Sequence, residues 1–153
     1  MRPVPVLMYH HINHHKGDMV TITPEAFEGQ MEYLYRAGYR TLKIAELIAY
    51  INNGLTLTQK AVVVTFDDGW LDNYMYAFPI LKKYKINATV FLITNRVENA
   101  SQNAAKIPSF IPMHDESKSL IEKGEAHKVA LNWELIKEMS NSGMIEFYSH
   151  TKS

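Results

Sequence analysis

Two short stretches contain the residues of this sequence best suited to chemistry. The stretch "VVVTFDDGWLDNY", residues 62–74, places Asp67 and Asp68 side by side between an apolar run and a glycine. The stretch "EFYSHTKS" places His150 after a second short apolar run. Neighbouring residues point in different directions, so two adjacent carboxylates can take two roles, one as a base and one as a metal ligand. A carboxylate and an imidazole from separate segments together suit zinc or a similar divalent ion.

The alternative is a solvated Asp-Asp-Gly turn and an unrelated histidine, because short motifs also occur by chance. The positions of both stretches at the ends of predicted strands favour a site. In a parallel α/β sheet or barrel, reactive groups gather beyond the carboxyl ends of the strands. We therefore expect Asp67, Asp68 and His150 to meet at one rim, with Gly69 allowing a sharp backbone turn.

Four short apolar runs are predicted to be strands: Val4–Tyr9, Ala61–Phe66, Ala88–Ile93 and Met144–Tyr148. The middle two are apolar nearly throughout, which is typical of parallel strands covered on both faces. Four helical patterns lie around these runs. The first is expected to start at Thr23–Pro24 and stop at Gly38, and the second to start at Ile44 and stop at Gly54. The third runs from Asp72 to Tyr84 with a break at Pro79, and the fourth starts at Asn132 and stops at Gly143. Strands that alternate with helices predict an α/β fold with a parallel sheet, open or barrel-like.

Composition narrows the class of protein. The 153 residues suit one domain, and 16 basic and 16 acidic side chains balance, so no nucleic-acid footprint is indicated. An uncharged polymer such as a polysaccharide would suit this surface. The absence of cysteine excludes disulfides, thiolate zinc sites and cysteine nucleophiles. No apolar run reaches the roughly 18 residues of a membrane span, and the N-terminal residues lack the apolar region of a secretory signal.

The order of the motifs resembles a known family. "TFDDG" followed by "SHT" resembles the polysaccharide deacetylases of the NodB-homology group, metal-dependent carbohydrate esterases with a deformed (β/α) barrel. "PVLMYHHI" resembles their first strand, "FPILKKYKINATVFLI" their second helix and third strand, and "LNWELIKEMSNSGMIEFYSHT" the run into their histidine motif. The resemblance covers the whole chain. It implies that residues 1–153 form the N-terminal portion of such a barrel. The segment 95–129 is polar, shows little period and is too long for an ordinary loop, so we expect an insertion, a binding loop or a lid-like loop there.

The resemblance also implies an activity, which is hydrolysis of N-acetyl groups from an N-acetylated polysaccharide outside the cytoplasm or in the cell envelope. It makes Asp67 the catalytic base, and Asp68 and His150 ligands of a divalent metal, with zinc as first choice. The second histidine ligand of the family would fall just beyond Ser153, so we expect part of a site. A non-catalytic fragment or pseudoenzyme, and a sugar-binding module, are the alternatives.

Further residues have weaker expectations. His10 follows the first strand, where the family often places a Tyr-His pair near the active site, and Trp70 follows the aspartates and could stack on a sugar ring. Both are therefore candidates for substrate binding. The other histidines are expected in a solvated loop or on the surface: His11, His14, His15, His114 and His127. The strand that ends at Tyr148 is expected to leave an open sheet edge, through which the chain would associate with itself.

Overall fold

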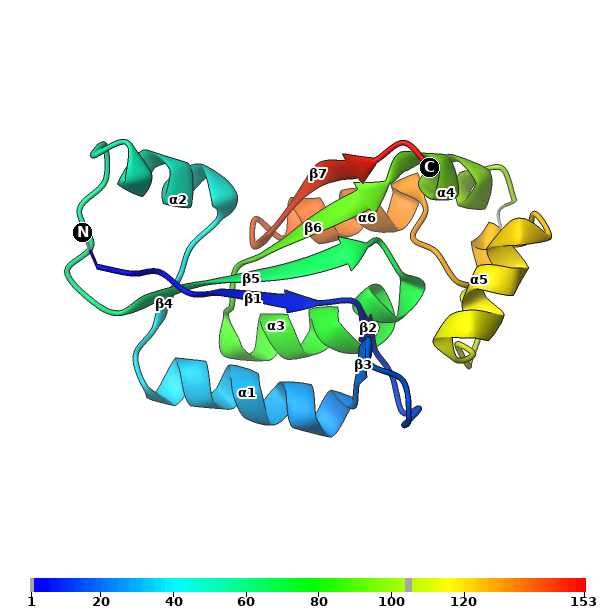
Figure 1. The fold of residues 1–153 in the computed structure, drawn as a ribbon, viewed down its shortest axis with the longest axis horizontal. Coiled ribbons are helices and arrows are strands. Elements are labelled where there is room, and N and C mark those ends of the chain that lie inside the picture. The colour runs from blue at the N-terminus through cyan, green and yellow to red at the C-terminus, as the bar shows by residue number, and fades with distance from the viewer. Residues whose placement is uncertain (1, 104–105) are drawn as a thin grey trace.

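A computed structural model describes residues 2–103 and 106–153 as an α/β fold (Figure 1). Its strands are β1 (Val6–Tyr9), β2 (His11–Ile12), β3 (Thr21–Ile22), β4 (Arg40–Thr41), β5 (Ala61–Asp68), β6 (Ala88–Ile93) and β7 (Ile145–Thr151). Its helices are α1 (Pro24–Arg36), α2 (Ile44–Ile51), the π-helix η1 (Asn73–Ala77), α3 (Phe78–Tyr84), α4 (Thr94–Ser101), α5 (His114–Glu122), the 3-10 helix η2 (Ala126–Lys128) and α6 (Trp133–Asn141). The predicted alternation of strands and helices is confirmed.

The strands form a parallel sheet in the order β1-β5-β6-β7, and the short β4 also pairs with β5. All the arrowheads of the long strands point toward the same end of the molecule (Figure 1). Residues 61–66 of β5 are all buried, which is why this strand is apolar on both faces. Side chains at the ends of β1, β5, β6 and β7 therefore share one rim.

Helix α1 shows how local signals define an element. Thr23 caps it by accepting a hydrogen bond from the Ala26 amide at 3.3 Å, and Pro24 occupies its first turn, as predicted. Its apolar stripe enters the core with Phe27 and Met31, both 0% exposed. Figure 1 shows α1 and α3 side by side along one side of the strands. Helices α1 and α3 thus cover the lower side of the sheet in that view.

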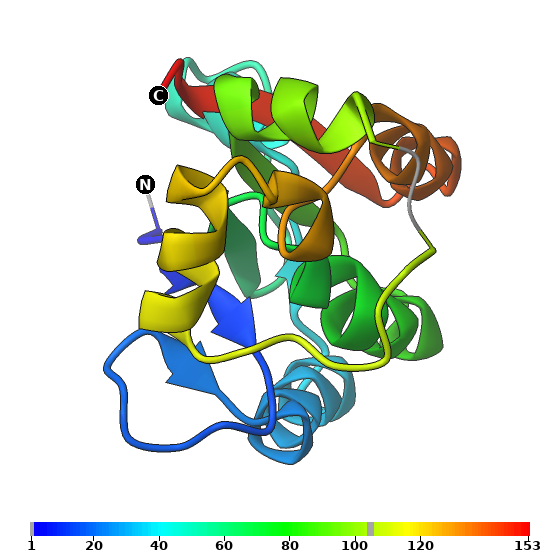
Figure 2. The ribbon, with the colours of Figure 1, turned by 90° about the vertical axis from the view of Figure 1, so that its right-hand side faces the viewer.

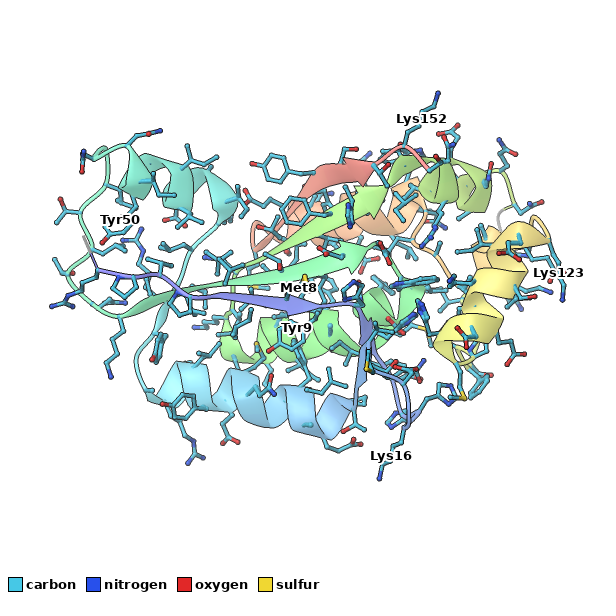
Figure 3. All side chains as sticks on the ribbon, viewed as in Figure 1. Met8, Tyr9, Lys16, Tyr50, Lys123 and Lys152 are labelled. Carbon is cyan, nitrogen blue, oxygen red and sulfur yellow. The ribbon has the colours of Figure 1, made fainter. Side chains whose placement is uncertain are left out.

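Strand β1 lies at an edge of the sheet and has one covered face. Tyr9 lies on the side of β1 that faces α1 (Figure 3). Its hydroxyl donates a hydrogen bond to Gln30 at 2.5 Å. Burial raises the pKa of Tyr9 to about 12, so the phenol stays a donor at neutral pH. Met8, on the opposite face, is 64% exposed. The edge strand therefore leaves apolar surface open, as its alternating exposure indicates.

Two helices differ from a simple amphipathic pattern. The stripe of α2 does not enter the main core, and Ile48 and Ile51 are 53% and 54% exposed. Its partners are a small cluster around Leu42 and Val63, which is too small to cover the whole stripe. The predicted break at Pro79 takes the form of a π-helical turn, η1, that runs into α3.

Among the described helices, none combines the length and apolarity that crossing a bilayer requires.

The segment 95–129 contains more helix than its weak periodicity indicates. Helices α4, α5 and η2 occupy much of it. Each buries only one or two side chains, such as Val97 and Ala100 of α4 and Ser117 of α5, so the sequence has no strong apolar stripe. Figure 2 shows α5 at the end of the sheet, beside the segment that joins β2 and β3. The segment thus lies over the rim, and a lid role for it stays a prediction.

Candidate active site

The two aspartates occupy the last two positions of β5, inside the strand and not after it. Asp68 has a φ of 74° and Gly69 a φ of 72°, so the chain leaves the sheet through two consecutive left-handed residues. Aspartate tolerates this region better than most side chains, and glycine has no steric penalty there. A Cβ on Gly69 would lie 2.7 Å from Leu92 Cδ2. The backbone must therefore turn at a residue without a side chain.

The turn is held from the far side by the end of the 95–129 segment. The Leu131 amide donates to the Gly69 carbonyl at 2.9 Å, and the Leu71 amide donates to the Val129 carbonyl at 2.8 Å. Trp70 and Ala130 form an antiparallel bridge between these two bonds. Strand-like pairing on both sides of Trp70 fixes the direction in which the aspartates leave β5.

His150 meets both aspartates at the rim. Its Nε2 lies 3.8 Å from Oδ2 of Asp67 and 3.8 Å from Oδ1 of Asp68. His150 lies within β7 and not beyond the strand as predicted, because β7 continues to Thr151 and is bulged opposite Leu92 and Ile93. The His150 side chain is 43% exposed, and those of Asp67 and Asp68 are 16% and 17% exposed. The three predicted residues are brought together where solvent and a ligand can reach them.

His10 joins the same group from the end of β1. Its Nε2 lies 4.0 Å from Oδ2 of Asp67, and its side chain is 23% exposed. The Asp67 carboxylate is therefore flanked by two imidazoles, from His10 and His150. The structure thus places His10 beside the predicted base, and its role in substrate binding stays a prediction.

Trp70 does not reach the surface. It is 1% exposed, so its ring cannot stack on a sugar in this structure. The His11 ring stacks on it at 4.3 Å between centroids, and the Arg96 guanidinium lies over it at 4.9 Å. The prediction treated an aromatic residue beside two aspartates as exposed, whereas the turn after Gly69 directs it into the core. Trp70 supports the site from beneath.

Arg96 is a site residue that the sequence did not reveal. It lies in the first turn of α4, just after β6, and its Nη1 is 3.9 Å from Oδ2 of Asp68. Burial lowers the pKa of Arg96 and the nearby Asp68 carboxylate opposes that shift. The sequence offered one indication of this role. Arg96 lies three residues beyond the end of β6, the strand that pairs with β5. Arg96 places a cation beside the carboxylate pair.

Four histidines expected on the surface or in a solvated loop are partly or fully buried: His11, His15, His114 and His127. His11 is 1% exposed and contacts Asp72, and His15 contacts the Ile111 carbonyl at 2.7 Å. His114 lies 3.2 Å from His11 through its Nδ1. For His11, His15 and His114 the expectation was wrong because segment 106–114 folds back over residues 11–15, a contact between distant parts of the chain.

The residues at the rim fit a divalent metal in part. Asp68 and His150 supply a carboxylate oxygen and an imidazole nitrogen, which are ligands that zinc accepts. Their 3.8 Å separation is longer than a hydrogen bond, so neither group is satisfied by the other. Across residues 2–103 and 106–153, no group of three or more histidine, aspartate or glutamate side chains has the geometry of a metal site. Asp68 and His150 thus offer two ligands, one fewer than the three protein ligands usual at a catalytic zinc site.

Comparison with known proteins decides the family. Residues 54–153, well over half of the chain, match the family model described as polysaccharide deacetylase. The chain belongs to the polysaccharide deacetylase family. Asp67, Asp68 and His150 all lie within the matched residues, and the predicted family resemblance is confirmed.

Individual relatives agree with this assignment. The chain is 34% identical over 148 residues to YxkH of Bacillus subtilis (strain 168), whose name refers to the same family, covering 97% of this chain and 42% of that protein. It is 26% identical over 147 residues to the poly-β-1,6-N-acetyl-D-glucosamine N-deacetylase of Escherichia coli (strain K12), covering 95% and 20%. The fold matches the Streptococcus pyogenes deacetylase PplD, solved in complex with acetate, with a TM-score of 0.73 and 27% identity, covering 96% and 55%. This polysaccharide deacetylase chain thus spans less than half the length of the two curated relatives and 55% of the PplD chain.

Proposed function

We propose that this chain takes part in the metal-dependent hydrolysis of N-acetyl groups from an N-acetylated polysaccharide. The observation that carries the proposal is the meeting of Asp67, Asp68 and His150 at one rim of a parallel sheet. This is the end of such a sheet where reactive groups gather. Membership of the polysaccharide deacetylase family supports the reaction class.

The proposed roles follow from where each atom lies. Asp68 and His150 would hold the metal, for which zinc is the first choice, and this chain would thereby supply part of the ligand set. A bound divalent ion polarises an acetyl carbonyl and increases the acidity of a water molecule. Arg96 stands on the other side of Asp68, with Nη1 3.9 Å from its Oδ2, and restricts the directions in which that carboxylate can turn.

Asp67 is the proposed base. Its Oδ2 faces both imidazoles, 3.8 Å from His150 Nε2 and 4.0 Å from His10 Nε2, and none of these contacts is a tight hydrogen bond. The carboxylate is therefore free to accept a proton from a water molecule at the rim, which is the step that a general base contributes. His10 lies beside the same carboxylate and can donate a hydrogen bond. We therefore propose that it contacts the substrate next to Asp67.

The proposed substrate is a polymer of N-acetylated sugar. The name of the Escherichia coli relative specifies poly-β-1,6-N-acetyl-D-glucosamine, and a polymer of that kind is one candidate for this chain. A polysaccharide substrate would place the protein in the cell envelope or outside the cytoplasm. Balanced charge over the 153 residues is compatible with a neutral polymer.

Acetate release from N-acetylglucosamine oligomers is the direct test. We expect release with added zinc from the chain, or from a longer form of the protein that contains it, and loss of release with a chelator. Asp67→Asn serves as the matched inactive variant. Oligomer binding without any acetate release would support a sugar-binding module or pseudoenzyme and reject the hydrolase.

A further inference from the structure

A buried ionisable pair lies directly beneath the rim. The His11 ring donates a hydrogen bond from Nδ1 to Oδ2 of Asp72 at 2.6 Å, and the two side chains are 1% and 0% exposed. His11 belongs to β2, and Asp72 follows the turn that begins at Gly69. The pair therefore joins the segment after β1 to the segment after β5, the two strands that carry His10 and Asp67.

Asp72 receives further donors from the same segment. Asn13 Nδ2 lies 3.4 Å from Asp72 Oδ2, and the Ile12 amide also contacts the carboxyl group. Burial raises the pKa of Asp72, and the hydrogen bonds and charge interaction with His11 oppose that rise. Three consecutive residues, from His11 to Asn13, thus converge on one buried carboxyl group.

The connection reaches His10 through Asn73. The Nδ2 of Asn73 donates to the His10 carbonyl at 2.7 Å and to Asp72 Oδ1 at 3.1 Å. The His10 backbone is therefore tied to the same residues that bind His11. With the His11 ring directed inward, the adjacent His10 ring is left at the rim, with Nε2 4.0 Å from Asp67.

The outer side of the His11 ring is also occupied. Its Nε2 lies within hydrogen-bond distance of Nδ1 of His114, at 3.2 Å, and its face stacks on Trp70 at 4.3 Å between centroids. Burial and the charge of His11 lower the pKa of His114, which favours the neutral form of that ring. Helix α5, which begins at His114, stands beside this segment in Figure 2. All polar atoms of the His11 ring and one of its faces are thereby fixed.

A gain in the stability of the fold does not by itself explain why such a pair is buried. Removing two ionisable groups from water has a desolvation penalty that can exceed their attraction, so apolar residues of similar size are often as stable. A hydrogen-bonded pair fixes direction and register more strictly than apolar packing does. The segment whose register it fixes is the one that presents His10.

We propose that Asp72 and His11 are positioning residues that hold the His10 imidazole against Asp67. The inference deepens the proposed function and rests on it for its catalytic meaning, whereas the placement of His10 is a separate, local property. Neither Asp72 nor His11 reaches the rim, so both act through His10.

Chemical reactivity of single histidines tests the placement without any substrate. Diethylpyrocarbonate labelling followed by mass spectrometry gives a rate for each of the seven histidines. We expect Asp72→Asn, which keeps the shape but removes the charge, to raise the rates at His10 and His11 severalfold and to leave His127 unchanged. An unchanged His10 rate in a folded Asp72→Asn protein overturns the proposal.

A second variant tests the proposal if Asp72→Asn does not fold. If circular dichroism shows that Asp72→Asn is unfolded, Asn73→Ala breaks the link to the His10 carbonyl and leaves the His11–Asp72 bond in place. We then expect a raised His10 rate with His11 still protected. Equal protection of His10 in Asn73→Ala and the unmodified protein rejects the proposal.

Kinetics separate this inference from the proposed function. If acetate is released, Asp72→Asn should lower kcat/KM about tenfold or more, because His10, the proposed substrate contact beside Asp67, loses its fixed position. An unchanged kcat/KM beside a raised His10 labelling rate overturns the catalytic meaning of the pair. If the unmodified protein releases no acetate, the proposed function fails, while the labelling rates still decide whether the pair positions His10.

Discussion

Nε2 of His150 lies 3.8 Å from Oδ1 of Asp68, although their strands are not neighbours in the sheet. Strand β6 lies between β5 and β7, so the two side chains meet across its end. Adjacent strands are about 4.8 Å apart, and a pair separated by one strand must reach across about twice that distance. The bulge opposite Leu92 and Ile93 helps by redirecting β7 at that point.

The first prediction concerns metal affinity. A catalytic zinc ion usually has three protein ligands, and Asp68 and His150 provide two. We expect weak zinc binding by the 153-residue chain in calorimetric titration, reduced about tenfold or more by His150→Gln. His127→Gln, a change away from the rim, is the control. Equal zinc affinity in the two variants would remove His150 from the ligand set.

The second prediction separates the two aspartates. Asp67→Asn should lower acetate release by about 10²–10⁴-fold, the usual contribution of a general base, and leave zinc content unchanged. Asp68→Asn should lose both activity and zinc, because it removes a ligand. Zinc content measured by atomic emission beside acetate release tests the pair. Equal zinc loss in both variants would show that the two roles are wrongly assigned.

The third prediction concerns the turn after β5. Gly69→Ala adds a Cβ at a φ of 72° and 2.7 Å from Leu92 Cδ2, so we expect a loss of about 2–4 kcal/mol in the free energy of unfolding. Gly38→Ala is the matched control, because Gly38 has a φ of 69° with no atom within 4 Å of the added Cβ. It should lose only the backbone part, about 1–2 kcal/mol. Equal losses in denaturant titrations would argue against a close approach at Gly69.

The fourth prediction concerns pH. The pKa of His114 is lowered in the fold from its usual 6.5 by burial and by the charge of His11, so the unfolded chain binds a proton more readily. The stability that depends on neutral His114 is present above pH 6.5 and is lost as the pH falls through the folded pKa. The raised pKa of Asp72 has the opposite sign, because its contribution is lost as the pH rises.

His114 by itself therefore makes the unfolding temperature fall as the pH drops below 6.5, and Asp72 opposes that fall. We expect His114→Gln to flatten that fall, and the exposed His14→Gln to leave it as it is in the unmodified protein. An identical acid dependence in His114→Gln and the unmodified protein would exclude His114 as the source.

The fifth prediction concerns self-association. Strand β1 pairs on one side only, with β5, and its outward residues Val6 and Met8 are 52% and 64% exposed. Free backbone groups beside apolar side chains recruit other strands. We expect light scattering to show a mass that rises with concentration, and Met8→Lys to reduce that rise. Tyr35→Lys, at a helix residue that is 60% exposed, is the control. A constant monomer mass at all concentrations contradicts the prediction.

Much of the fold follows from local sequence. The apolar run of β6 was predicted with its bounds, Ala88–Ile93, because a strand buried on both faces has no polar interruption. The start of α1 was predicted from Thr23 and Pro24, whose side chains act on the backbone of their own turn. The sequence also indicated Asp67, Asp68 and His150 as one group, since parallel strands end at a common rim.

Contacts between distant segments decided the rest. Trp70 is buried because the turn after Gly69 is paired with residues 129–131, and no local pattern predicts that pairing. Arg96 reaches Asp68 only because β6 lies next to β5. His11 looks like one member of a solvated histidine cluster until Asp72 and His114 enclose it. Local sequence therefore determined the elements and the rim, whereas burial and partners of polar side chains depended on tertiary packing, because they are set by residues far away in the chain.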